Sequence, residues 1–425
     1  MKLALLGCGV VGSSLVRLLD RDATLLERRL GEPLELAAIV VRDPSRPRDP
    51  WVPAHLLTSD LERAITDSSV DVVVEVMGSP PVALVALEQA LRHGKSVVTA
   101  NKDVIADHLD TLEALAEANR VDLLFEAAVA GGVPLIRVLR TSLFGERLWS
   151  VQGIVNGTSN YVLTRMAEEG IELGAAVEEA IRLGYAEADP TRDLNGADAA
   201  AKAAILASLA FECSVRADDV RTEGVLGVSA ADMHFAAANH RVIKLIASAR
   251  RVQQPGGEAL CVEVFPAMVP REHPLAGVRD AANAIFVEGQ AVGELLFMGP
   301  GAGGLPTAAA VLADILEAAQ NRRAGRFAVG VGRERPRFLD AGWVVGRFAL
   351  SLVVRDAAGV LARVAEVFGD EGVSIAQVEQ LAAGEGEAHL MLVTHETTLS
   401  ALVAVEQRLA KLGDVVRRDQ RYRVL

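Results

Sequence analysis

The chain has 425 residues, enough for two or three domains that each bury a core. Hydrophobic residues make up 51% and charged residues 23%, which excludes a disordered or fibrous protein. The formal net charge of −13 argues against nucleic acid or an anionic membrane surface as partner, because both bind clustered lysines and arginines. Neither a signal-peptide pattern nor an apolar run of ~18 to 20 residues is visible, so we expect no membrane span and a cytoplasmic location.

The first region alternates short apolar runs with helical patterns. This alternation is typical of a parallel sheet covered by helices on both faces, so it predicts an α/β fold with a Rossmann-like, doubly wound domain over residues 1–132. We expect strands at 3–6, 36–41, 70–76, 96–99 and 123–126, and helices at 13–19, 61–66, 81–93 and 109–119.

The next region, 133–304, is predicted to be an α+β domain that carries substrate and dimer contacts. Its expected helices are 161–168, 175–183, 197–211 and 240–249, and its expected strands are 259–266 and 284–288. An amphipathic pattern at 305–320 predicts a long helix that completes the first domain, with Asp314 and Glu317 on its solvent face.

The last region begins with a segment rich in Gly and Arg, 321–346, which we interpret as a solvated linker. Residues 347–425 follow the order β-α-β-β-α-β, which predicts a small ferredoxin-like module. Its expected strands are 348–354, 374–380, 389–393 and 415–418, and its expected helices are 361–369 and 399–412.

A glycine loop follows the first expected strand and opens a helix. It reads Gly7-Cys8-Gly9-Val10-Val11-Gly12. Glycines permit a tight turn and a close approach of the main chain to a pyrophosphate, which the N–H groups of the helix N-terminus can bind. We therefore predict dinucleotide binding, although an ordinary glycine turn would have the same spelling.

The second expected strand ends in Arg42-Asp43. An acid at this strand end binds the ribose hydroxyls of NAD, whereas an arginine suits the 2′-phosphate of NADP. Arg42, with Arg46 and Arg48 nearby, favours NADP, but Asp43 keeps NAD open. The plainer alternative is a solvated charged loop.

Two lysines are candidates for the chemistry. Lys102 follows an expected strand at its carboxyl edge, where open parallel sheets bind ligands. Lys202 is four residues after Asp198 in an alanine-rich helix, so both lie on one helical face. Apolar surroundings would favour proton donation by Lys202, whereas Asp198 would hold its charge. The plainer alternatives are an exposed ion pair, or helix capping by Asp193 or Asp198.

Several segments together resemble the homoserine dehydrogenase family, and the C-terminal module resembles an ACT regulatory domain. The segments for the dehydrogenase are 75–78, 99–103, 126–134, 156–161, 187–202 and 301–307, and those for the ACT domain are 356–361 and 372–375.

The resemblance implies reversible, NAD(P)H-dependent reduction of L-aspartate 4-semialdehyde to L-homoserine, in threonine, methionine and isoleucine biosynthesis. Lys202 would be the general acid and base, and Glu187 and Asp198 would hold the substrate. Gly7, Gly9, Val10, Val11, Gly12 and Arg42 would bind the cofactor together with Lys102, Gly184 and Gly303.

The resemblance also implies a bound Na⁺ or K⁺, held by Glu126 and by the carbonyl groups of Val129, Gly131 and Val133. An oxygen-only shell suits a hard cation. The residues alone favour a simpler interpretation, in which Glu126 ends a strand before a glycine turn. Such a cation would be structural, because Lys202 can serve the proton transfer.

Partners follow from the resemblance as well. We expect a homodimer or homotetramer, and a threonine effector at the ACT module is a hypothesis. Because the glycine loop lies at the first residues, we expect no kinase domain ahead of it.

Two other functions stay open. A semialdehyde dehydrogenase would need a reactive cysteine thiolate, for which Cys213 and Cys261 are the candidates. A non-catalytic regulator would bind NADP and an amino acid without turning homoserine over.

Overall fold

The computed structural model describes residues 1–328, 330, 332–384 and 386–425. Val329 and Val331 of the expected linker, and Glu385 of the expected C-terminal module, lie outside the described residues. No helix in this described part is both long and apolar enough to cross a membrane.

The N-terminal region contains a parallel six-stranded sheet in the order β3-β2-β1-β4-β5-β6, so the predicted Rossmann-like class is confirmed. The strands are β1 (Lys2–Leu6), β2 (Glu35–Val40), β3 (Leu57–Thr58), β4 (Val72–Glu75), β5 (Ser96–Thr99) and β6 (Leu123–Leu124). The helices are α1 (Val10–Arg21), α2 (Ala23–Leu30), α3 (Leu61–Thr66), α4 (Pro80–Arg92) and α5 (Lys102–Asn119). Every side chain of β4 is buried, as expected for a strand covered on both faces.

Two elements of this region, α2 and β3, have no counterpart in the sequence-based prediction, and α5 begins seven residues earlier than expected, at Lys102 rather than at 109. The early start has a local cause, because the Oδ1 atom of Asn101 accepts a hydrogen bond from the Val104 N–H and caps the helix. Lys102 is therefore the first residue of a helix at the carboxyl edge of β5.

The second sheet has eleven strands, and its longest path runs β12-β11-β7-β9-β10-β17-β13-β15-β14. Its strands are β7 (Leu148–Ile154), β9 (Arg241–Gln254), β10 (Gly257–Pro270), β11 (Ala282–Gly289), β12 (Gly293–Pro300), β13 (Val345–Arg355), β14 (Ile375–Gly384), β15 (Glu387–Thr394) and β17 (Val415–Val424), with β8 (Arg221–Thr222) and β16 (Thr397–Thr398) at its sides. The helices of this part are α6 (Gly157–Glu169), α7 (Leu173–Leu183), α8 (Thr191–Leu194), α9 (Ala197–Phe211), α10 (Ala230–Ala238), α12 (Val360–Asp370) and α13 (Leu399–Leu409). The β-α-β-β-α-β order of the C-terminal module is confirmed.

The prediction of a helix at 240–249 is wrong, because this segment belongs to β9. β9 forms a long antiparallel hairpin with β10 through the turn at Gly256 and Gly257, which both have positive φ. Residues 243–249 are all buried, so the alternation of apolar and polar residues that marks a half-exposed strand is missing. Cross-strand pairing decided the structure here, and local sequence could not show it.

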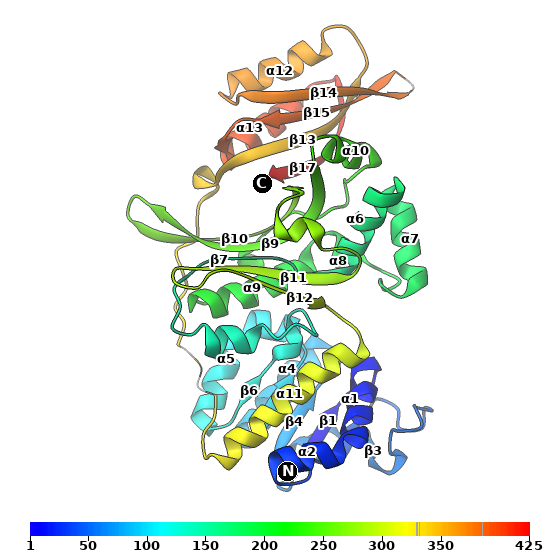
Figure 1. The fold of residues 1–425 in the computed structure, drawn as a ribbon, viewed down its shortest axis with the longest axis vertical. Coiled ribbons are helices and arrows are strands. Elements are labelled where there is room, and N and C mark those ends of the chain that lie inside the picture. Colours follow the sequence, from blue (N-terminus) through cyan, green and yellow to red (C-terminus); the bar gives the residue numbers. More distant parts are fainter. Residues whose placement is uncertain (329, 331, 385) are drawn as a thin grey trace.

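The helix α11 (Gly304–Arg323) lies beside α1 against the first sheet (Figure 1). Its buried residues Val311 and Ile315 share a core with β1. The placement of Asp314 on a solvent face is wrong, because this residue is 2% exposed and forms an ion pair of 2.8 Å with Arg137. Arg137 also lies 2.6 Å from Glu317, so both acids face the protein.

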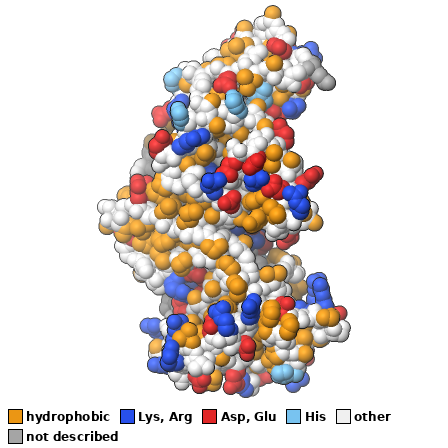
Figure 2. Space-filling model, turned by 45° about the vertical axis from the view of Figure 1, so that its right-hand side comes forward, with side chains coloured by type: hydrophobic (Ala, Val, Ile, Leu, Met, Phe, Trp, Pro, Cys, Tyr) orange, Lys and Arg blue, Asp and Glu red, His pale blue; other side chains and the backbone are white. Residues whose placement is uncertain are grey.

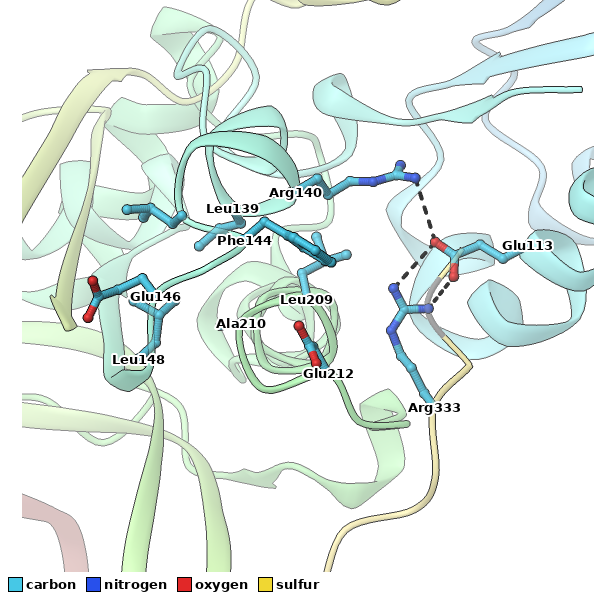
Figure 3. Close-up of a pocket in the computed structure, with 11 residues that line it drawn as sticks. Glu113, Leu139, Arg140, Phe144, Glu146, Leu148, Leu209, Ala210, Glu212 and Arg333 are labelled. Carbon is cyan, nitrogen blue, oxygen red and sulfur yellow. Dashed lines mark hydrogen bonds and ion pairs between the residues drawn. The ribbon is translucent and has the colours of Figure 1, made fainter. Parts of the chain in front are cut away.

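The segment 321–346 is mostly exposed or half-exposed along its described length, but some of its side chains are anchored in the protein. Arg333 is buried and forms a two-pronged ion pair with Glu113 of α5, while Arg140 approaches the same carboxylate from the other side (Figure 3). Leu339 is buried in the core of the C-terminal module. One arginine of this segment, Arg333, is therefore held in a buried ion pair, which composition could not reveal.

Candidate active site

The glycine loop lies between β1 and α1, and its glycines serve different steric purposes. Gly7 has a φ of +98°, and a Cβ there would lie 2.8 Å from the Val76 carbonyl oxygen. A Cβ on Gly12 would collide with the carbonyl oxygen of Gly7, whereas a Cβ on Gly9 would meet open space. The turn itself thus requires Gly7 and Gly12, and the bare backbone at Gly9 is left accessible to a ligand.

The start of α1 is open to an anion. Gly9 provides no side-chain cap, the first turn contains no acid, and Val10 is 75% exposed. The first N–H groups of a helix have no partner within it, so they can bind a phosphate. The turn at Gly303 and Gly304 lies beside them, because a Cβ on Gly304 would lie 2.6 Å from the Ser14 hydroxyl.

The arginines after β2 do not behave alike. Arg42 is exposed and forms no ion pair within the described ranges. Arg48 donates to the carbonyl oxygen of Cys8 at 2.6 Å and thereby holds its loop against the glycine loop. Asp43 is exposed as well, and its Oδ1 atom accepts from the N–H and the hydroxyl of Ser45 at 2.9 and 2.6 Å.

A buried carboxylate organises the carboxyl edge of the first sheet. Glu75, at the end of β4, accepts from the Thr99 hydroxyl at 2.5 Å and from the Met77 N–H at 2.6 Å. Burial raises the pKa of Glu75, against the effect of these hydrogen bonds. Glu75 thereby ties the end of β4 to the end of β5, directly before Asn101 and Lys102.

Three donors converge on the carboxylate of Asp198 at the start of α9. The Nζ atom of Lys202 lies 2.7 Å from Oδ2, the Nζ atom of Lys102 lies 3.2 Å from Oδ1, and the amide of Asn156 donates to Oδ2 at 2.8 Å. Lys202, 12% exposed, also donates to the Val155 carbonyl oxygen at 2.7 Å. The carboxylate of Asp198 thus links Lys102, at the carboxyl edge of the first sheet, to Lys202 of α9.

The charges of this cluster support one another. Although burial raises it, the two lysines hold the pKa of Asp198 well below its ordinary range. Burial alone would lower the pKa of Lys102, but Asp198 raises it above its usual value. Asp193 accepts from Asn156 at 2.7 Å, and burial raises its pKa, whereas the pKa of Asp198 is lowered.

Two expected site residues lie outside this cluster. Glu187 is exposed, in the loop between α7 and α8, and makes no hydrogen bond or ion pair within the described chain. Gly184 ends α7 with a φ of +78° and is also exposed. The structure therefore brings Lys102, Asp198 and Lys202 together, but leaves Glu187 and Gly184 at the surface.

Glu126 is buried and does more than end a strand. Its carboxylate accepts three backbone N–H groups, from Leu135, Ile136 and Arg137, at 2.6 to 2.9 Å. Burial raises the pKa of Glu126, and these hydrogen bonds oppose that effect. The nearby carbonyl oxygens of Val129 and Gly131 accept no backbone N–H from the residues that the structure describes.

The cysteines do not support thioester chemistry. Cys213 and Cys261 are buried, and burial raises the pKa of each thiol to about 11. A thiol of this kind is rarely the thiolate that attacks a carbonyl.

Two residues of the candidate site received no role from sequence reasoning. Asn156 caps α6 through its Oδ1 atom while its amide bridges Asp193 and Asp198, and an Asn-Gly before a helical pattern could have suggested the cap. Glu75 ends a wholly apolar strand, and an acid in such a position needs buried partners.

Comparisons with known proteins agree with this geometry. The family model of the homoserine dehydrogenase NAD-binding domain matches residues 7–126, the homoserine dehydrogenase model matches 134–316, and the ACT domain model matches 348–414.

Proteins similar to this chain are named homoserine dehydrogenases. A homoserine dehydrogenase of Corynebacterium glutamicum is 45% identical over 402 residues, which cover 94% of this chain and 90% of that protein. The crystal structure of a homoserine dehydrogenase from Thiobacillus denitrificans has a TM-score of 0.91 at 33% identity, covering 100% of this chain and 98% of that one. A hyperthermophilic archaeal homoserine dehydrogenase in complex with NADPH has a TM-score of 0.62 at 28% identity, covering 75% of this chain and 98% of that one.

The similarity covers nearly the whole chain and thus leaves no support for a cysteine-dependent enzyme or a non-catalytic regulator. The chain belongs to the homoserine dehydrogenases, which are nicotinamide-dependent oxidoreductases acting on a CH–OH group.

Proposed function

We propose that Lys202 moves the proton in the interconversion of L-homoserine and L-aspartate 4-semialdehyde, beside Asp198 at the start of α9. The observation that carries this proposal is the position of Asp198 between Lys202 and Lys102. Lys102 stands at the carboxyl edge of a parallel sheet, where such folds bind their ligands. Lys202 is therefore linked to that edge through a single carboxylate, that of Asp198.

The hydrogen bonds of Lys202 leave room for a substrate oxygen. A lysine ammonium has three N–H donors. Asp198 and the Val155 carbonyl take two of them, so one is left for the substrate hydroxyl. In reduction Lys202 gives a proton to the emerging alkoxide, and in oxidation it accepts the proton from the hydroxyl.

The substrate carries an ammonium group, for which carboxylates are the natural partners. The two oxygens of Asp198 already contact Lys102, Lys202 and Asn156. Asp198 would therefore bind the substrate ammonium through oxygens that it shares with these residues. Glu187 is exposed and is the carboxylate open to the substrate ammonium. We therefore assign Glu187 and Asp198 to substrate binding, with Asp198 also orienting Lys202.

The cofactor would lie along the glycine loop. The residues present fit a dinucleotide: Gly9 leaves the backbone bare, the N–H groups of Val10 and Val11 are uncapped, and Gly303 lies alongside. When bound, the nicotinamide ring supplies or accepts the hydride. Arg42 is free to meet a 2′-phosphate while Asp43 is bound to Ser45, which favours NADP over NAD, as does the archaeal relative that binds NADPH. Lys102 and Gly184 complete the proposed cofactor site.

A monovalent cation, Na⁺ or K⁺, would be held by Glu126 and the carbonyl groups of Val129, Gly131 and Val133. The residues fit such an ion, because buried carbonyl oxygens at Val129 and Gly131 accept no backbone N–H in the described chain. All donors are oxygens, which suits a hard cation of structural purpose.

The remaining assignments follow the family resemblance. A dimer is supported by the apolar edge strand β12, where Leu296 and Met298 are about half exposed; Figure 2 shows hydrophobic side chains gathered at the level of this sheet. Threonine as ACT effector, the role in threonine, methionine and isoleucine biosynthesis, and a cytoplasmic location are parts of this proposal. So are the domain limits at 132, 304 and 346.

The test is a homoserine oxidation assay with NADP⁺ and with NAD⁺, on the wild type and on Lys202→Ala. We expect a kcat/KM at least tenfold higher with NADP⁺, and a loss of about 10³-fold in kcat for Lys202→Ala, within the usual range for a general acid or base. Lys411→Met, a change of an exposed lysine in the C-terminal module, is the matched control and should leave kcat unchanged. A Lys202→Ala enzyme with wild-type kcat would refute the role of Lys202.

A further inference from the structure

The C-terminal module is joined to the rest of the chain by consecutive side chains of β17. Each of them binds a polar residue from the region between α9 and the end of β10. Gln420 and Arg421 bind Glu223 at 3.3 and 2.6 Å, Tyr422 binds Asp232 at 2.8 Å, and Arg423 binds Glu263 at 2.8 Å. β17 also pairs with β10, so the two parts share one sheet.

This junction is packed like a core. Tyr422 is fully buried, and with Met391 and Val393 it belongs to the same hydrophobic cluster as α9. In Figure 1 the module forms the upper end of the molecule, with α10 beside it, and its strands continue the second sheet. A displacement of β17 would therefore also displace the segments that it contacts.

Glu223 belongs to a short segment that rests on the turn before α9. Its own N–H donates to the Val264 carbonyl oxygen at 2.8 Å, which ties it to β10. The Val225 N–H donates to the Leu194 carbonyl oxygen at 2.7 Å, and a Cβ on Gly224 would collide with that same carbonyl group. On the other side, a Cβ on Gly196 would lie 2.8 Å from Thr222. Segment 222–225 and turn 194–196 thus fit with no free space between them.

The turn is part of the catalytic cluster. Asp193, directly before it, is bound by Asn156, and Asp198 and Lys202 follow it in the first two turns of α9. From Arg421 to Lys202 the contacts are therefore continuous: an ion pair, the segment 222–225, the turn 194–196 and the N-terminus of α9.

We propose that Glu223 is a positioning residue for the homoserine dehydrogenase reaction, held by Arg421 so that turn 194–196 presents Asp198 and Lys202 in their working geometry. The inference rests on the proposed role of Lys202. Arg421 also binds Glu406 of α13 at 3.1 Å, so a displacement of α13 in the C-terminal module reaches the catalytic turn through one guanidinium group.

The charge of Glu223 matters in this arrangement. Burial raises its pKa, and Arg421 opposes that effect. Without Arg421 the largely buried carboxylate would keep Gln420 as its hydrogen-bond partner among the described residues, with Arg418 and Glu406 nearby. This state is less favourable, and we expect the segment to move from it.

The test compares Glu223→Gln and Arg421→Met with Tyr422→Phe in the full-length enzyme. Glu223→Gln keeps the shape and the contact with Gln420 but removes the charge. We expect both variants of the pair to lower kcat for homoserine about tenfold without changing KM for the cofactor. The kcat of the double variant should be no lower than that of the less active single variant, because the two residues act as one pair. Arg421→Lys should recover part of the lost kcat.

Tyr422→Phe is the matched control, because it removes one hydrogen bond of the same junction without touching Glu223. It should lower the thermal midpoint while kcat stays at the wild-type value. If Glu223→Gln also kept wild-type kcat and KM, or if its kcat fell only in proportion to its loss of folded protein, the proposal would be overturned. A Lys202→Ala enzyme with wild-type activity would instead remove the proposed function, so the two failures are distinguishable.

Discussion

Two lysines of the middle region, the largely buried Lys202 and the buried Lys244, both bind two oxygen atoms, yet their surroundings differ in one respect. Lys202 binds the carboxylate of Asp198 and one carbonyl group. Lys244 binds only neutral groups, the side-chain oxygen of Asn160 at 2.9 Å and the Val278 carbonyl oxygen at 2.5 Å. Burial accordingly lowers the pKa of Lys244 to about 8.

The comparison shows that apolar surroundings do not by themselves identify a catalytic lysine. The argument from desolvation, which the alanine-rich sequence around Lys202 suggests, applies in the structure to Lys244. What distinguishes Lys202 is position: it shares a carboxylate with a lysine on the edge of the nucleotide sheet, whereas Lys244 lies inside β9 and fastens α6 to the loop around Val278.

We expect the largest loss of activity when the surroundings of Lys202 are made like those of Lys244. Asp198→Asn leaves Lys202 with neutral acceptors only, as at Lys244, and releases Lys102 as well. We expect kcat for homoserine to fall about 10² to 10³-fold, because the proton-transfer group loses its orientation. Steady-state kinetics with saturating cofactor would measure it.

Asp193→Asn is the control for this change. Asp193 also binds Asn156 but contacts neither lysine directly, so its variant should keep at least a tenth of the wild-type kcat. Equal losses for both variants would mean that the cluster acts through its general charge and not through the contact of Asp198 with the lysines.

A smaller effect concerns stability at alkaline pH. The pKa of Lys244 is about 8 in the folded protein and about 10.4 in an unfolded chain. Between these values the unfolded chain binds more protons than the native one, so this residue makes the free energy of unfolding rise with pH, by at most about 1.4 kcal/mol per pH unit. Lys244→Met should remove this contribution.

The measurement is the free energy of unfolding of wild type and Lys244→Met in denaturant at pH 7, 8, 9 and 10. The difference, wild type minus variant, should be constant up to about pH 8 and grow above it. Lys411→Met, at an exposed position, should show no such growth. A flat difference for Lys244→Met would show that the lysine keeps an ordinary pKa.

The sequence predicted those parts of the molecule whose physical cause is local. Neighbouring residues determine the glycine loop, the parallel strands and the four-residue spacing of Asp198 and Lys202. The structure shows the loop, the sheet and the ion pair. The doubly wound fold and the β-α-β-β-α-β module follow from periodicity and element order alone.

Contacts between distant residues could not be predicted. β9 looked helical because both its faces are buried, and Asp314 looked solvent-exposed because its partner Arg137 is far away in the sequence. The same holds for Asn156, which meets Asp198 across 42 residues, and for Glu223, which meets Arg421 across 198. Polar residues at ordinary spacings carry no sign of such partners.

The most direct test of the central claim is the distance from the Nζ atom of Lys202 to the substrate hydroxyl oxygen, in a crystal structure with oxidised cofactor and homoserine bound. We expect a hydrogen bond of about 3 Å, with the contacts of Lys202 to Asp198 and to the Val155 carbonyl kept. A hydroxyl group bound by water or by another side chain, with Lys202 out of reach, would contradict the account.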